Sequence, residues 1–262
     1  MTRRVDIFPK SAVAVMKPWI RGLMHRAGFD IISLRRPILP PDYNTGLPPD
    51  FDQADIAAYF SVRPFTMTSP ERIFSLRRVV EYLVKAKLPG AYVECGVWRG
   101  GSMMAIAQAL LECRMRDHDL YLFDTFEGWP EPTAEDGELV RQTWHEDRAA
   151  WSVVPLEVVQ ANLEATGYPS ERLHYVAGRV EDTLPEKAPD TISLLRLDTD
   201  FYKSTKHELA TLYPRLVSGG VLIIDDYGYY EGSRRAVDEF FHVHGPVLLN
   251  RIDSDARIAI KP

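Results

Sequence analysis

Two apolar runs of the sequence each end in a pair of acidic residues. The stretch LRLDTDFYKST carries Asp198 and Asp200 at the end of one run, and VLIIDDYGYY carries Asp225 and Asp226 at the end of another. If both runs form parallel strands, neighbouring strands lie roughly 4.8 Å apart and ligands bind beyond their carboxyl ends. We therefore expect the four carboxylates to converge at one edge of a sheet.

Bare carboxylates that converge repel one another, which raises their pKa values or costs stability. A hard divalent cation removes this repulsion, and a ligand set of oxygens without His or Cys favours Mg²⁺, with Mn²⁺ or Ca²⁺ as alternatives. A cation also makes a bound alcohol easier to deprotonate, and a carboxylate that is left over can accept the proton. The alternative interpretation is that these acids only cap strand ends. The presence of a cofactor-type loop in the same chain favours a functional site.

That loop is the stretch VECGVWRGGS, which follows a predicted strand and opens a predicted helix. Its glycines, Gly96, Gly100 and Gly101, permit a tight turn and the close approach of a ligand. Asp124 ends the next predicted strand, where doubly wound folds place an acid against ribose hydroxyls. Glu94, just before the turn, offers a partner for a cationic group. A ribose and an amino-acid tail fit S-adenosylmethionine better than NAD, because the glycine spacing is not that of a dinucleotide-binding fingerprint.

These side chains require a framework in which strands and helices alternate. Near-continuous apolar strands separated by helices predict a parallel sheet with helices on both faces. A further helix is expected from Pro70, with Thr68 or Ser69 as its cap. The last two runs, VLLNRI and ARIAIK, are predicted to pair as a hairpin. The other predicted strands are AYVEC, LYLFD, LHYVAG, SLLRLD and VLIIDD, and the other predicted helices are SMMAIAQALLECRM, residues 156–166, KSTKHELATLYPRLV and SRRAVDEFFHVH.

Residues 127–155 are predicted to form a long polar loop, which is typical of a lid. Tryptophans in this loop either stack on a sugar face or pin the loop to the domain, and the sequence leaves both open. Tyrosines after the second acid pair are expected to wall an acceptor pocket. These aromatic residues are Trp129, Trp144 and Trp151 in the loop, and Tyr227, Tyr229 and Tyr230 after the acids.

The N-terminal part of the chain differs from the rest in charge. Residues 1–36 hold eight Lys and Arg against two Asp and Glu. We expect residues 1–64 to form a basic helical extension with a Pro-rich linker, ahead of a domain at residues 65–262. A solvated arm or a helix in a homo-oligomer contact is the favoured interpretation of the basic segment. Peripheral contact with anionic lipid is the less favoured alternative.

Composition excludes several classes of protein. The chain has 262 residues and a net charge of −6, and nucleic-acid binding requires the opposite, a basic surface. Two cysteines give no disulfide framework, which favours a reducing, cytoplasmic setting. No run reaches 18 apolar residues, and Lys17 and Pro18 interrupt the candidate signal segment. We therefore expect a cytoplasmic protein whose main partner is not nucleic acid.

Four motifs in order, YVECGVWRGGS, LFDTFEGWP, RLDTDFYKST and GGVLIIDDYG, resemble the macrocin O-methyltransferase family, which includes the aminocoumarin-sugar methyltransferases. The resemblance covers about Phe65 to Phe241. It implies a Rossmann-like class I methyltransferase fold, α/β, with a seven-stranded, mostly parallel sheet, helices on both faces and the last strand antiparallel. It also implies S-adenosylmethionine as cofactor and Mg²⁺ as the metal.

The resemblance implies roles for individual residues as well. Asp198, Asp225 and Asp226 look like the metal ligands, and Asp200 looks like the general base. The remaining correspondences concern the cofactor: Glu94, Gly96 and Ser102 line its methionine end, Asp124 its ribose, Gly178 and Asp182 its adenine, and Thr66 and Met67 close over it.

The expected function is Mg²⁺-dependent O-methylation of a sugar hydroxyl in a glycosylated natural product, as in antibiotic biosynthesis, or in a polysaccharide or other glycan. The metal is expected to bind an acceptor with vicinal hydroxyls. A catechol-type O-methyltransferase that acts on a phenolic acceptor uses the same metal and fold, and is the alternative enzyme. A nonenzymatic protein that binds S-adenosylmethionine is the alternative from another class.

Overall fold

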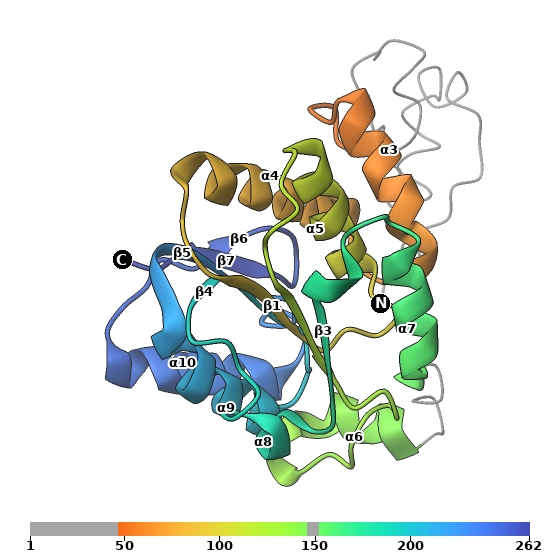
Figure 1. Ribbon diagram of the computed structural model, residues 1–262. Coiled ribbons are helices and arrows are strands. Elements are labelled where there is room, and N and C mark those ends of the chain that lie inside the picture. The colour runs from red at the N-terminus through yellow and green to blue at the C-terminus, as the bar shows by residue number, and fades with distance from the viewer. Residues whose placement is uncertain (1–46, 146–151) are drawn as a thin grey trace, which may run out of the picture. The chain divides into compact units, whose positions relative to one another are not determined.

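A seven-stranded sheet forms the centre of the computed structural model, which describes residues 47–145 and 152–262 (Figure 1). The strand order is β3-β2-β1-β4-β5-β7-β6. β7 runs antiparallel to β5, β6 runs antiparallel to β7, and the other pairs are parallel. The predicted Rossmann-like, mostly parallel sheet is therefore confirmed. The strands are β1 Ala91–Cys95, β2 Leu120–Asp124, β3 Leu173–Ala177, β4 Ile192–Leu197, β5 Leu216–Ile224, β6 Asn250–Arg251 and β7 Arg257–Ile260.

Helices cover both faces of this sheet, and each face has its own apolar core (Figure 1). One core contains residues of α3, α4, α5 and α7, and the other contains residues of α8, α9 and α10. Successive strand residues point to opposite faces, so that Tyr92 of β1 belongs to the first core and Val93 to the second. The helices are α3 Gln53–Val62, α4 Pro70–Ala86, α5 Gly101–Glu112, α6 Gly137–His145, α7 Leu156–Glu164, α8 Val180–Thr183, α9 Tyr202–Leu212 and α10 Glu231–His244.

The start of α4 follows the predicted capping pattern. The Ser69 side chain accepts a hydrogen bond from the N–H of Arg72, and Pro70 occupies the first helical position, where its missing N–H costs nothing. The helix ends at Lys87, which adopts a left-handed conformation ahead of the predicted Pro-Gly stop. The Ser69 cap fixes the position of Arg72, which lies in the first turn of the helix.

The predicted long loop at 127–155 is wrong in one respect, because it contains α6 and a preceding 3-10 turn at Ala134–Asp136. Val140 is the buried apolar residue of α6. On its exposed side, Glu138 pairs with Arg141 at 2.9 Å and accepts a hydrogen bond from Gln142. Such local pairs support a helix, and Leu139, Val140 and Trp144 recur at helical spacing, which is a signal that could have identified it. Trp151, also expected in this loop, lies outside the described residues.

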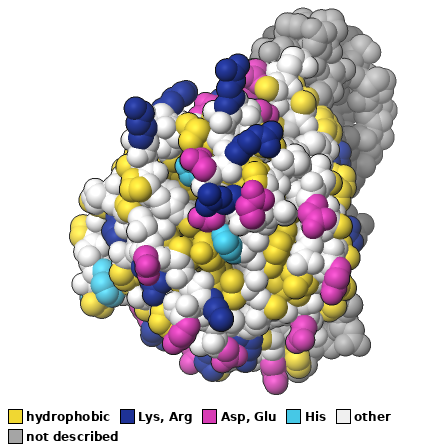
Figure 2. Space-filling model, viewed as in Figure 1, with side chains coloured by type: hydrophobic (Ala, Val, Ile, Leu, Met, Phe, Trp, Pro, Cys, Tyr) yellow, Lys and Arg dark blue, Asp and Glu magenta, His cyan; other side chains and the backbone are white. Residues whose placement is uncertain are grey.

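Ionisable side chains gather at the start of the outer strand β3, which is an open edge of the sheet. His174 lies 2.9 Å from Asp119, and Arg172 lies 3.3 Å from the same carboxylate. Figure 2 shows acidic and basic side chains interspersed with apolar ones over the face on which β3 lies. Charged side chains on an edge strand discourage pairing with another chain.

The basic segment 1–36 lies outside the described residues. The compact unit that holds the sheet begins at Asp50, and α3 packs against α4 and α5. Asp55 of α3 is buried and forms ion pairs with Arg77 at 3.2 Å and with Arg78 at 2.5 Å. Among the residues that are described, no helix combines the length and the apolar character needed to cross a bilayer.

Glu208 of α9 is completely buried, and burial raises the pKa of its carboxyl group from 4.5 to about 8, against a smaller opposing effect of the Thr199 hydroxyl. Because the folded-state pKa lies above the unfolded value, the folded chain retains a proton that the unfolded chain releases, and stability is lost as the pH rises between these values. Glu208→Gln is therefore expected to be more stable than the parent by about 4 to 5 kcal/mol above pH 8 and by no more than about 1 kcal/mol at pH 5, because a tenfold change in proton affinity is worth about 1.4 kcal/mol.

Urea unfolding at the two pH values measures this difference. Glu186→Gln, at an exposed position, is the control and should change little at either pH. A gap between the Glu208 variant and the parent that stays constant with pH would contradict the prediction.

Candidate active site

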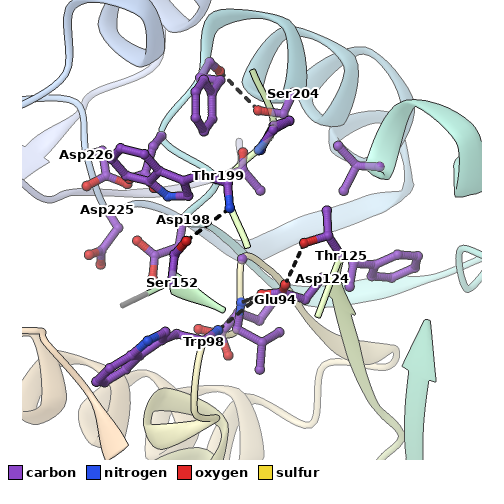
Figure 3. A pocket seen from close by; sticks show the side chains of 18 of the residues that line it. Glu94, Trp98, Asp124, Thr125, Ser152, Asp198, Thr199, Ser204, Asp225 and Asp226 are labelled. Carbon is purple, nitrogen blue, oxygen red and sulfur yellow. Dashed lines mark hydrogen bonds between the residues drawn. The ribbon is translucent and has the colours of Figure 1, made fainter. Parts of the chain in front are cut away.

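A cavity of about 480 Å³ opens beyond the carboxyl ends of β1, β2, β4 and β5. This is the edge where parallel α/β sheets bind their ligands. In Figure 3, Asp198, Asp225 and Asp226 lie on one side of the cavity, and Asp124 and Thr125 lie on the other. The acid cluster and the glycine turn therefore share a single cavity, as the sequence predicts.

Three of the four aspartates gather closely. Asp198, Asp200 and Asp226 each offer an oxygen within 4.8 Å of the other two. Asp198 and Asp200 do not continue the strand that precedes them, because β4 ends at Leu197 and Asp200 has a φ of 70°. The left-handed conformation, which is rare for residues other than Gly, Asn and Asp, is part of the turn that leads into α9 and brings the Asp200 carboxylate back toward the cluster.

The fourth aspartate, Asp225, is buried beside this cluster and is held by two arginines. Arg72 of α4 forms a short ion pair with one of its oxygens. Arg196 of β4 approaches the other oxygen at 2.6 Å. The environment of Asp225 is therefore distinct from that of the three gathered acids, which the sequence did not indicate.

Arg196 and Glu94 are both deeply buried charged side chains of the site, each with 1% of its surface exposed. Arg196 is the one that joins several acids. It forms a short ion pair with Glu94 and lies 2.7 Å from Asp198, in addition to its contact with Asp225. Its position follows from sheet register, because Glu94 of β1 lies directly opposite Arg196 of β4. Sequence reasoning did not select this residue, although a charged side chain inside the apolar run SLLRLD is a signal that could have identified it.

Arg72 was also missed, and it links three segments. Besides Asp225, it pairs with Asp253 at 2.7 Å and with Asp255 at 3.0 Å, in the loop between β6 and β7. Burial raises the pKa of the Asp253 carboxyl group, but hydrogen bonds from Arg72 and Ser69 outweigh this effect and lower the pKa to about 2. The first turn of α4, the end of β5 and the terminal hairpin are thus held together by one guanidinium group.

Burial leaves the gathered acids poorly stabilised in their ionised form. Burial and the neighbouring Asp198 raise the pKa of Asp200 to about 8. Burial raises the pKa values of Asp198 and Asp226 well above the usual range, against the effect of Arg196 on Asp198. One oxygen of Asp226, Oδ2, is buried without a hydrogen-bond partner among the described residues. An excess of carboxylates with an unpartnered oxygen fits a hard cation such as Mg²⁺.

Asp124 organises the glycine turn opposite the cluster. Its side chain accepts hydrogen bonds from the N–H groups of Val97 at 2.7 Å, Trp98 at 3.1 Å and Phe126 at 2.8 Å. Asp124 also lines the cavity, so that capping this turn is compatible with the ribose-binding role expected from the sequence. A carboxylate can accept about four hydrogen bonds, which leaves capacity for a ligand.

The turn itself requires glycine at position 96. Gly96 has a φ of 82°, and a Cβ at this position would lie 2.0 Å from the backbone oxygen of Asp198. The N–H of Gly96 donates to the carbonyl of Phe123, and the N–H of Asp198 donates to that of Cys95. The cofactor-type turn and the first acid of the cluster are therefore in direct backbone contact.

The remaining predicted residues divide into two groups. Asp182 is exposed on α8 and is not among the residues that line the cavity, whereas its neighbours Arg179, Val180 and Glu181 are. Tyr227 also lies outside the lining, because its hydroxyl donates to Asp238 on α10. The predicted residues that do line the cavity are Thr66, Met67, Glu94, Gly96, Ser102, Asp124, Gly178, Asp198, Asp200, Asp225, Asp226, Trp129, Tyr229 and Tyr230.

Comparison with known proteins agrees with this geometry. The family described as Macrocin-O-methyltransferase (TylF) matches residues 52–258. The 8-demethyl-8-(2,3-dimethoxy-alpha-L-rhamnosyl)-tetracenomycin-C 4'-O-methyltransferase of Streptomyces olivaceus is 34% identical over 73% of this chain and 73% of its own length. The demethyldecarbamoylnovobiocin O-methyltransferase of Streptomyces niveus is 35% identical over 67% of each chain.

A third relative, the mycinamicin III 3''-O-methyltransferase of Micromonospora griseorubida, is 32% identical over 69% of this chain and 71% of its own length. Among solved structures, the O-methyltransferase NovP superposes with a TM-score of 0.70 and 31% identity, over 75% of this chain and 82% of that one. These matches and the geometry of the cavity show that the chain is a methyltransferase of the macrocin O-methyltransferase family.

Proposed function

We propose that the protein transfers a methyl group from S-adenosylmethionine to a sugar hydroxyl of a glycosylated natural product, with Mg²⁺ in the aspartate cluster. The observation that carries this proposal is the cavity that joins the cluster Asp198, Asp200 and Asp226 to the glycine turn. Its substrate class is supported by the relatives, one of which is named for a rhamnosyl-bearing tetracenomycin and another for the 3'' position of mycinamicin III.

The cavity offers complementary groups for each part of the cofactor. Glu94 is 1% exposed, and its Oε2 is buried without a hydrogen-bond partner among the described residues. This oxygen is suited to the ammonium group of a methionine tail, with Gly96 and Ser102 beside it. Asp124 is suited to the ribose hydroxyls. The proposal extends to Gly178 at the adenine and to Thr66 and Met67 over the cofactor. It leaves out Asp182, which does not line the cavity.

For the metal we propose Asp198, Asp225 and Asp226 as ligands, as the family resemblance implies. Burial of these carboxylates beside Glu94 and Asp200 leaves more negative charge than Arg196 and Arg72 can neutralise, since Arg72 also pairs with Asp253 and Asp255. A bound divalent cation would supply the missing charge and would stabilise negative charge on an acceptor oxygen.

Asp200 is the proposed general base. It lies in the cluster and lines the cavity. Burial and Asp198 raise its pKa to about 8, which places the group near the range expected of a base at neutral pH. The hydroxyl oxygen of the acceptor attacks the methyl carbon, and Asp200 takes the proton of that hydroxyl. The carbon–sulfur bond breaks, and S-adenosylhomocysteine, a neutral thioether, leaves. Holding the two reactants in contact in a partly enclosed cavity supplies much of the rate.

Mass spectrometry of glycosides after incubation with S-adenosylmethionine and Mg²⁺ tests the function. One methyl group per modified sugar is expected. EDTA should abolish the product, and excess Mg²⁺ should restore it, because the buried carboxylates require a cation. Methylation of a planar diphenol alone would indicate a catechol-type enzyme instead. Cofactor binding without any Mg²⁺-dependent product would indicate a nonenzymatic binding protein.

Asp200→Asn and Asp225→Asn separate base from ligand. Asp200→Asn is expected to reduce turnover by about 10²- to 10⁴-fold, because the proton acceptor is lost, with unchanged affinity for S-adenosylhomocysteine in calorimetry. Asp225→Asn is expected to raise the Mg²⁺ concentration needed for half-maximal activity. Asp190→Asn, at an exposed position before β4, is the control.

The opposite pattern, in which Asp200→Asn raises the Mg²⁺ requirement and Asp225→Asn does not, would contradict these roles. It would assign the metal to Asp198, Asp200 and Asp226, the three acids that the structure gathers most closely.

A further inference from the structure

A row of aromatic side chains runs from the aspartate cluster to the rim of the cavity. Phe201, the residue after Asp200, meets Trp129 edge-on with 5.3 Å between ring centroids. Trp129 meets Tyr230 at 5.9 Å, and Tyr230 meets Tyr229 at 4.8 Å, again edge-on. All four rings line the cavity. Edge-to-face contacts at these distances are favourable, so that the four rings form one continuous aromatic wall.

The aromatic wall passes from the interior of the protein to solvent. Phe201 at its inner end is buried, Trp129 and Tyr230 are half-buried, and Tyr229 at its outer end is 53% exposed. The inner end adjoins Asp200, the proposed base, so that the reacting sugar hydroxyl must lie there. The group to which the sugar is attached therefore lies toward the outer end, beside the exposed ring of Tyr229.

The backbone that carries Tyr229 is firmly held for so exposed a residue. The carbonyl of Asp226 accepts hydrogen bonds from the N–H groups of Tyr229 at 3.0 Å and of Tyr230 at 2.9 Å. The guanidinium group of Arg234 on α10 donates to the carbonyl of Gly228 at 3.0 Å. The turn is thus closed from within and tied to the helix that follows it.

Gly228 also ties this turn to the loop between β6 and β7. Its N–H donates to the carbonyl of Asp255 at 2.7 Å, and a Cβ at position 228 would lie 2.2 Å from the backbone oxygen of Ser254. The Asp255 side chain is in turn paired with Arg72 at 3.0 Å. The ring of Tyr229 is therefore displayed on a fixed backbone. Such a rigid aromatic side chain supplies contact area at a low cost in conformational entropy.

We propose that Tyr229 is a specificity-determining residue that receives the aglycone, the group to which the methylated sugar is attached, and that it selects acceptors with a flat, apolar aglycone. This inference rests on the proposed function, which places the sugar at Asp200. Of the three tyrosines expected to wall the acceptor pocket, Tyr227 lies outside the lining and Tyr230 is partly covered by its aromatic neighbours. Tyr229 lines the cavity and keeps its ring exposed.

The chemistry of this ring favours an apolar aglycone over a further sugar unit. An aromatic ring gains from contact with another flat apolar group, both by covering apolar surface and by ring–ring attraction. A hydroxylated sugar in the same place would lose water from hydroxyl groups, which costs free energy unless each finds a hydrogen-bond partner.

Binding of two glycosides of one sugar tests the proposal. Methyl α-L-rhamnopyranoside and 4-nitrophenyl α-L-rhamnopyranoside carry the same vicinal hydroxyls and differ only in the aglycone. Their affinities are measured by NMR titration of the protein loaded with S-adenosylhomocysteine and Mg²⁺. We expect the parent to bind the nitrophenyl glycoside about fivefold to tenfold more tightly than the methyl glycoside, in the range for an aromatic pair.

Variants assign this preference to the ring. Tyr229→Phe should keep the preference, and Tyr229→Ser should lose it while its affinity for the methyl glycoside and for S-adenosylhomocysteine stays within about twofold of the parent. Tyr82→Ser, at a partly exposed position on α4 outside the cavity lining, is the matched control and should keep the preference.

Three outcomes would overturn the proposal: a parent that shows no preference, a preference that survives Tyr229→Ser, and a preference that Tyr229→Phe or Tyr82→Ser abolishes. The binding measurement does not depend on turnover. If the preference is present and only Tyr229→Ser removes it, the inference stands even when neither glycoside is methylated, and the proposed function alone fails.

Discussion

The buried guanidinium group of Arg196 is the interaction on which the site depends. It contacts Glu94 on the cofactor side and Asp198 and Asp225 on the acid side. A buried charge is tolerated only when it is paired, and removal of one partner leaves the others without compensation. Because β1 and β4 place Glu94 opposite Arg196, the register of two parallel strands sets the distance between the cofactor end of the cavity and the aspartate cluster. The fold and the chemistry of this protein are linked through that one pairing.

A second consequence is an imbalance of charge. Arg196 and Arg72 compensate part of the acidic group, and Arg72 is shared with Asp253 and Asp255 in the hairpin loop. The remaining carboxylates, Asp200 and Asp226 above all, have pKa values raised by burial. Such an arrangement is unfavourable by itself and becomes favourable when a cation is bound. Affinity for a cation and stability of the folded chain are therefore expected to depend on each other.

The family and most of the fold could be predicted from the sequence, because they depend on local patterns. Alternating apolar strands and helices predicted the parallel sheet, and the Ser-Pro pair predicted the start of α4. The acids and the glycine turn stood at predicted strand ends, and parallel strands bring such ends to one edge. Helix α6 was missed although Leu139, Val140 and Trp144 recur at helical spacing, because only nine residues carry the pattern and most of their neighbours in the sequence are polar.

The sequence by itself determined which chemical groups this protein brings to one edge of its sheet, since residue type and position along a strand suffice for that. Only the tertiary structure decided how those groups pair. Asp225 lies against two arginines, Asp200 returns through a left-handed turn to Asp198 and Asp226, and Asp182 lies outside the residues that line the cavity. These partners are far apart in the chain or depend on a single backbone angle. Their contacts are set by strand register and by the packing of loops, neither of which leaves a periodic pattern in the sequence.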